Sequence, residues 1–156
     1  MKGNPKVIDI LNHLLADELT AINQYIVHAE MCSNWRYHRL HDKLERRAIE
    51  EMKHAEKLIA RILFFEAHPI VSKLNELHIG SDVKQQFEND LGAESAAVKM
   101  YNAAVEMTVA CHDNGTREIL ESILTDEEAH IDWIEAQLDQ VKQMGIQMYL
   151  AEQIRE

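Results

Sequence analysis

Cysteine, glycine and proline are scarce in this chain of 156 residues, which contains two Cys, five Gly and two Pro. The two cysteines, Cys32 and Cys111, form no Cys-x-x-Cys pair. This excludes a disulfide scaffold, a zinc finger and a thioredoxin-type redox site, and we expect both to be small core or interface residues. Because Gly and Pro mark breaks between elements, so few of them predict long, uninterrupted elements.

Long apolar runs and an excess of basic residues are also missing. The longest unbroken apolar runs, 62–65 and 148–151, have four residues each, far short of the roughly 20 needed to span a membrane. The N-terminal segment carries Asp9 and lacks the apolar stretch of a signal peptide. With 27 acidic against 16 basic residues, the formal net charge is −11, which argues against a nucleic-acid or anionic-membrane partner. We expect a soluble, cytoplasmic protein.

Apolar residues recur at helical spacing through most of the chain, and no segment shows the alternation of a strand. Four long helices are predicted, separated by a bend near Trp35, an aperiodic stretch at about 66–81 and a break at 114–116, which also caps the fourth. Gly145 is the expected C-terminal stop of the fourth helix. One long crossover between short connections is typical of the ferritin-like four-helix bundle. We therefore predict an all-α single domain over 1–156, with the bundle at about 5–144 and a short helix at about 146–155.

The second half of the chain echoes the first at an interval of 76 residues. In each half, a lone Glu is followed 33 residues later by a Glu-x-x-His sequence. The repeated pairs are Glu18 and Glu94, Glu51 and Glu127, and His54 and His130. A single Glu-x-x-His is weak evidence for a site, whereas six potential ligands repeated in register are strong evidence.

These glutamates lie on apolar stripes, where a solvated Glu is not expected. Glu18, for example, lies four residues from both Leu14 and Ile22. The alternative is that they are ordinary surface carboxylates of amphipathic helices. If buried, four unpaired carboxylates would be prohibitive, but two divalent cations would balance their charge. Two Glu-x-x-His helices plus one inward Glu from each of the other two form the di-iron or di-manganese pattern, and this ligand set suits those metals better than structural zinc.

The symmetry of the repeat also predicts how the ligands divide. Glu51 and Glu127 are the expected bridges between two metal ions. Glu18 with His54 would complete one position, and Glu94 with His130 the other.

Four further residues stand next to the predicted ligands. Glu50 and Asp126 each precede a Glu-x-x-His and could accept the free ring N–H of the opposite histidine, or they could be surface acids. Tyr25 and Tyr101 each lie seven residues after a lone Glu on the same face. They could donate a hydrogen bond across the bundle to a ligand carboxylate, or be simple core tyrosines. The remaining histidines that lack a ligand partner in the repeat are read as ordinary polar or pore-adjacent residues. These are His28, His38, His41 and His112.

The chain resembles the bacterioferritin family over nearly its whole length, from MKGNPKVIDILNHLLADELTAINQY through EEMKHAEKLIARILF to DEEAHIDWIEAQLDQVKQMGIQMYL. The resemblance implies a homo-oligomeric hollow shell of 24 subunits that stores iron. It also implies a ferroxidase centre, with dioxygen or peroxide as oxidant, at the same six residues. A small iron–sulfur ferredoxin, the bacterioferritin-associated ferredoxin, is the partner expected from the family.

The resemblance further implies a haem b shared by two subunits, with Met52 of each as axial ligand. A thioether is a reasonable ligand for haem iron, although a Met at this place could equally be interface core. The chain departs from the family at one place. Members often carry a His and acids on the cavity-facing side of the second helix, whereas Arg46 and Arg47 stand there in this chain, with Glu50 retained.

Two other functions use similar residues. A rubrerythrin-type di-iron peroxidase would usually carry a Cys-x-x-Cys rubredoxin module, which is absent from this sequence. A purely structural or electron-transfer haem bundle would make the doubled ligand set redundant. Gel filtration separates these alternatives from a shell, because both predict a dimer.

Overall fold

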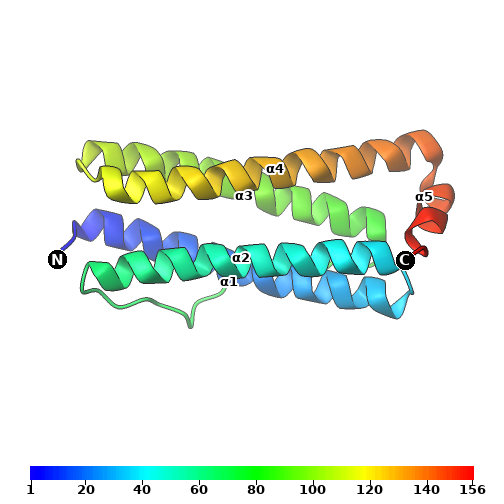
Figure 1. Ribbon diagram of the computed structural model, residues 1–156, viewed down its shortest axis with the longest axis horizontal. Coiled ribbons are helices and arrows are strands. Elements are labelled where there is room, and N and C mark those ends of the chain that lie inside the picture. Colours follow the sequence, from blue (N-terminus) through cyan, green and yellow to red (C-terminus); the bar gives the residue numbers. More distant parts are fainter.

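The computed structural model describes residues 1–156 and contains five helices and no strands. Four long helices lie side by side, and the fifth folds across one end of the bundle (Figure 1). α1 packs mainly against α2, and α3 against α4. The predicted all-α, ferritin-like four-helix bundle with a short C-terminal helix is confirmed. The helices are α1 (Pro5–Asn34), α2 (His38–Phe64), α3 (Val83–Ala110), α4 (Asn114–Met144) and α5 (Ile146–Gln153).

Side-chain caps explain where three of the long helices begin. Asn4 accepts a hydrogen bond from the backbone N–H of Lys6, and Pro5 follows in the first turn. Asp82 caps α3 in the same way. The cap of α4 lies one residue earlier than the sequence break predicted. Asp113, rather than the 114–116 segment, accepts from both the backbone N–H and the hydroxyl of Thr116.

Helix ends in the two halves repeat as the ligands do. Arg36 and His112, which are 76 residues apart, both adopt the left-handed backbone conformation, with φ of 67° and 56°. Each residue reverses the chain just after a helix. Gly145, with φ of 80°, ends α4 as predicted and allows the turn into α5.

The apolar core is divided into two clusters along the bundle. One cluster contains Leu11, Leu58 and Ile123, and the other contains Leu40 and Phe87. Between them, the middle turns of the four long helices bury polar residues instead. The polar candidate site is therefore enclosed at both ends by packed apolar side chains. The buried Cys32 belongs to one cluster, as predicted for a core residue.

The long crossover is held against α1 by a row of polar side chains. Backbone N–H groups of the crossover donate to Asn12, Thr20, Gln24 and His28 over distances of 2.8 to 3.2 Å. His28 is fully buried and is not the surface or pore residue predicted from the sequence. The spacing of four residues between the last three was the available signal, because it places them on one helix face.

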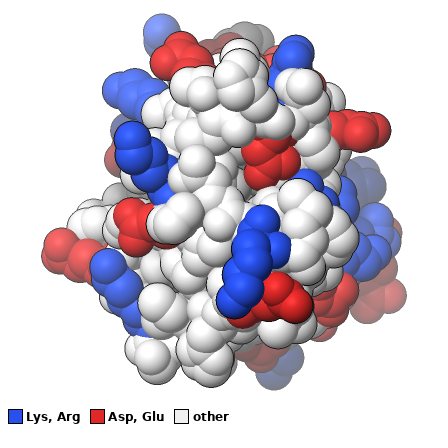
Figure 2. Space-filling model, turned by 90° about the vertical axis from the view of Figure 1, so that its left-hand side faces the viewer, with Lys and Arg blue, Asp and Glu red and all other residues white.

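Charge is mixed on the end of the bundle at which α1 and α4 begin. Figure 2 shows acidic and basic side chains interspersed there, with no continuous basic patch on this face. None of the helices is long and apolar enough to cross a membrane.

Candidate metal centre

The six residues predicted from the repeat meet in the middle of the bundle. Each of the four long helices contributes at least one of them, and none is more than 4% exposed. The helical period explains the convergence, since residues at i and i+3 share a helix face. The set consists of Glu18 from α1, Glu51 and His54 from α2, Glu94 from α3, and Glu127 and His130 from α4.

Potential ligand atoms form two overlapping groups. One group combines Glu18 and His54 with the two Glu-x-x-His carboxylates, and the other combines Glu94 and His130 with the same two. Within each group, one atom from every residue lies within 4.8 Å of the others. The carboxylates common to both groups are Glu51 and Glu127. The geometry thus matches the division expected from the repeat, with two positions that share two carboxylates.

Several polar atoms at the centre have no hydrogen-bond partner. These buried atoms are Oε1 of Glu51, Oε1 of Glu127 and Nδ1 of His130. The Nδ1 atom of His130 lies 3.1 Å from Glu51, and that of His54 lies 3.0 Å from Glu127. Buried polar atoms are normally satisfied, so unpartnered ones call for an explanation. Oxygen and imidazole donors that converge in this way fit two divalent metal ions.

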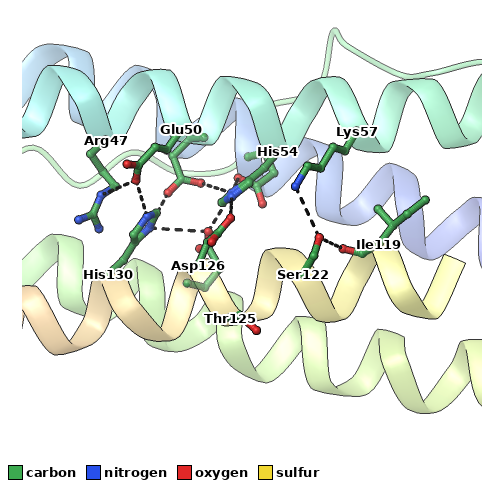
Figure 3. Close-up of polar contacts among 12 residues, drawn as sticks. Arg47, Glu50, His54, Lys57, Ile119, Ser122, Thr125, Asp126 and His130 are labelled. Carbon is green, nitrogen blue, oxygen red and sulfur yellow. Dashed lines mark hydrogen bonds and ion pairs between the residues drawn. The ribbon is translucent and has the colours of Figure 1, made fainter.

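The outward nitrogens of both histidines are held by acids from the opposite helix (Figure 3). Nε2 of His54 lies 3.0 Å from Asp126, and Nε2 of His130 lies 2.8 Å from Glu50. Both contacts were predicted as one of two possibilities. A carboxylate on Nε2 favours the tautomer with its proton there, which leaves Nδ1 free to face the centre.

Two buried tyrosines hold the remaining carboxylates. The hydroxyl of Tyr25 donates to Glu94, and that of Tyr101 donates to Glu18. Their rings belong to the two apolar clusters on either side of the centre. Both predicted alternatives therefore hold together, because each tyrosine is a core residue and also a donor to the centre.

Burial strongly shifts the titration of the centre. It raises the pKa of Glu51 well above its usual range and that of Glu127 to about 10, and neighbouring carboxylates act in the same direction. Burial acts on Glu94 too, but hydrogen bonding with His130 and Glu127 outweighs it and lowers the pKa to about 2. Burial alone would lower the pKa of His54, yet the surrounding carboxylates raise it. Without metal, protons therefore supply part of the charge balance.

Two cavities reach the centre from opposite faces of the bundle. The first, of about 500 Å³, lies between α1, α3 and the crossover, and its lining includes Glu18, Glu94 and Glu127. The second, of about 420 Å³, lies between α2 and α4 and is lined in part by His130 and Arg47. The buried centre is thus open to small ions on both sides.

Met52 lies on α2 outside this centre and is 44% exposed. Ile49 and Leu63, on the same stripe of α2, are also exposed, at 44% and 58%. The two arginines of the neighbouring turn differ. Arg46 is exposed, whereas Arg47 is buried against aromatic rings, a difference that the sequence did not predict.

A bundle with one long crossover and a doubled carboxylate–histidine cluster defines the ferritin-like class, and the family model described as Ferritin-like domain matches residues 8–144. Bacterioferritin of Rhodobacter capsulatus is 43% identical over 94% of this chain and 91% of its own length. Bacterioferritin of Brucella melitensis biotype 1 is 42% identical over 96% and 92%. Bacterioferritin of Mycolicibacterium paratuberculosis is 37% identical over 97% and 96%. The chain belongs to the bacterioferritin family.

Proposed function

We propose that this protein is a ferroxidase and iron store, which oxidises Fe²⁺ and keeps the ferric product as a mineral inside a shell of 24 subunits. The observation that carries the proposal is the pair of buried ligand groups that share Glu51 and Glu127. Membership of the bacterioferritin family supports iron as the metal, homo-oligomeric assembly and storage as the purpose.

The residues divide the work as follows. Glu18 and His54 hold one Fe²⁺, Glu94 and His130 hold the other, and the two shared carboxylates lie between them. Protons retained by the shared carboxylates leave as the cations enter, because a carboxylate binds metal in its ionised form. Two adjacent Fe²⁺ can then deliver two electrons together, so that one peroxide and two protons become two waters, or dioxygen and two protons become peroxide.

The cavity between α1 and α3 is the proposed entrance for Fe²⁺. Its lining includes the acidic side chains of Asp17, Glu76 and Glu88 ahead of the ligands themselves. Acidic walls raise the local concentration of cations. The opposite cavity contains Lys43 and Arg47 and is therefore less favourable for an incoming dication.

Haem b is the second proposed cofactor, held by Met52 from each of two subunits. The exposed apolar residues on the same stripe support burial of this face against a second copy. Held there, haem would supply an electron route by which stored ferric iron returns to Fe²⁺. A bacterioferritin-associated ferredoxin is the proposed electron donor.

The central test is Glu51→Ala, with Glu56→Ala as a matched control on the exposed side of the same helix. Rapid-mixing kinetics of Fe²⁺ oxidation should be slowed in Glu51→Ala and unchanged in the control. Gel filtration should give a species of several hundred kilodaltons for both. Normal kinetics in Glu51→Ala would reject the centre, and a dimer as the only species would reject the shell.

A further inference from the structure

The repeat that makes the six ligands symmetric breaks down at one charged residue behind them. Arg47 is 5% exposed, and its counterpart 76 residues later is Ile123, which is fully buried in the apolar core. A buried guanidinium therefore stands behind one half of the centre only. Its Nη1 atom has no hydrogen-bond partner.

Arg47 acts on the histidine of its half through Glu50 (Figure 3). Its Nε atom lies 3.4 Å from the same Glu50 oxygen that lies 2.8 Å from Nε2 of His130. The carboxylate is thus shared between a guanidinium and an imidazole. An acceptor that is neutralised by a guanidinium donates less electron density to the imidazole, whose metal-facing nitrogen is then a weaker donor.

Arg47 also stands behind the carboxylate of the same half. Its guanidinium carbon lies 6.0 Å from the ring centre of Tyr25, whose hydroxyl donates to Glu94. The other side of the guanidinium faces Trp133, with 5.8 Å to that ring centre. Both unshared ligands of this position, Glu94 and His130, are therefore backed by residues in contact with one cation.

The other half lacks such a cation. Asp126, which holds His54, forms no ion pair with Lys or Arg. Lys57, one turn from His54, hydrogen-bonds Ser122 instead (Figure 3). Tyr101, the counterpart of Tyr25, packs in the apolar cluster that contains Ile123. The electrostatic difference between the halves therefore depends mainly on Arg47, with Lys43 beside it in the same cavity.

We infer that Arg47 is a positioning residue that makes the two metal positions unequal, so that the Glu94–His130 position binds a divalent cation more weakly than the Glu18–His54 position. The inference rests on the proposed function, in which the six residues hold two metal ions. The direction follows from charge, because a nearby guanidinium repels a dication and neutralises the acid that supports its histidine ligand. The weaker position then fills last and releases its ion first.

Single-position variants test this order with Co²⁺ alone as the probe, added to full-length protein freed of metal by chelation. Glu94→Ala retains the Glu18–His54 position, and Glu18→Ala retains the other. Calorimetry and the visible absorption of bound Co²⁺ should give a dissociation constant about tenfold lower in Glu94→Ala than in Glu18→Ala, as expected for one partly screened charge.

Adding Arg47→Gln to each variant tests the cause. In the Glu18→Ala background, Arg47→Gln should tighten Co²⁺ binding about tenfold, and in the Glu94→Ala background it should change binding less than twofold. Arg47→Lys, which keeps the positive charge, should keep the weak affinity. Arg46→Gln removes an exposed charge on the same helix and should change neither constant. A merely structural role would predict weaker binding in Arg47→Gln and no rescue by Lys.

The outcomes separate this inference from the proposed centre. Equal constants in the two single-position variants, or a tighter Glu94–His130 position, overturn the inference, and this comparison stands even if Arg47→Gln does not fold. Two Co²⁺ bound by the unaltered protein, without the expected response to Arg47→Gln, leave the centre intact and reject the role of Arg47. No bound Co²⁺ in the unaltered protein rejects both.

Discussion

Tyr25 on α1 donates its hydroxyl hydrogen to Glu94 on α3, and this bond joins the two halves of the repeat across the candidate metal centre. The counterpart from the other half runs in the opposite direction, from Tyr101 on α3 to Glu18 on α1. Each lone glutamate is thus oriented by a tyrosine from the other half of the chain. The two hairpins of the bundle are therefore tied together at the level of the centre.

Removing one of these donors should destabilise the metal-free protein. In Tyr25→Phe, the buried Glu94 loses a hydrogen bond that water cannot replace, and the free energy of unfolding should fall by about 1–3 kcal/mol. Urea unfolding followed by circular dichroism measures this change. Tyr37→Phe, at a tyrosine with no hydroxyl hydrogen bond to the rest of the chain, is the control and should change stability little. Equal stabilities for both variants would contradict the role of the bond.

The acids that hold the histidines should govern metal affinity. Asp126→Asn weakens the acceptor on Nε2 of His54, so the affinity for Co²⁺ should fall about 10- to 100-fold. Asp132→Asn, an exposed acid on the same helix, should leave binding unchanged. Calorimetry gives both constants, and an unaltered affinity in Asp126→Asn would show that the contact does not support the ligand.

The stability of the metal-free protein should depend on pH with a definite sign. The pKa of Glu127 is raised from 4.5 in the unfolded chain to about 10 in the fold. The folded state therefore holds a proton that the unfolded state releases above pH 4.5, so stability falls as the pH rises from about 4.5 towards about 10. The slope for one such group is at most about 1.4 kcal/mol per pH unit.

Denaturant unfolding at several pH values measures this slope. Glu127→Gln, which cannot ionise, should flatten it, and bound Co²⁺ should flatten it too because metal replaces the proton. The raised pKa values of Glu51 and His54 act in the same direction. A stability that rises from pH 6 to pH 9 in the metal-free protein would refute the expected protonation.

The crossover should be released when its buried anchor is lost. Asp90 on α3 accepts a hydrogen bond of 2.7 Å from Gln24, and its carboxylate lies 3.0 Å from Nδ1 of His28. These are two of the α1 side chains that hold the crossover. Asp90→Ala leaves them without a buried partner, which should cost about 3–5 kcal/mol of stability.

Hydrogen exchange locates that effect. The backbone N–H of Gly80 donates to His28, so its exchange should accelerate in Asp90→Ala relative to amides in the middle of α2. Glu106→Ala, an exposed acid on α3, should leave this exchange unchanged. If the amide of Gly80 remains protected in Asp90→Ala, the anchor is not Asp90.

The haem proposal has a spectroscopic test. Protein reconstituted with haem b should show the absorption of iron bound by two thioethers, and Met52→Leu should abolish it because leucine offers no sulfur ligand. Met148→Leu, at another exposed methionine, should retain the spectrum. The same spectrum in Met52→Leu would exclude Met52 as the ligand.

The amino-acid sequence alone was enough to predict the helices and the six residues of the centre. Helical periodicity is local, so the phase of each Glu relative to its apolar neighbours could be read without knowing the fold. The repeat then related one half to the other. Even Gly145, at the end of α4, was predictable, because its backbone conformation is a property of the residue itself.

Contacts between helices depend on the rotation and register of each helix against its neighbours, which local periodicity does not specify. The sequence placed Arg46 and Arg47 side by side without distinguishing them, and only packing against Tyr25 and Trp133 buries Arg47. His28 likewise looked like an ordinary polar residue until the aperiodic crossover came to lie on it. The sequence by itself thus determined the helices and the ligand set. The tertiary structure decided what stands behind each ligand, because those neighbours come from segments distant in the chain.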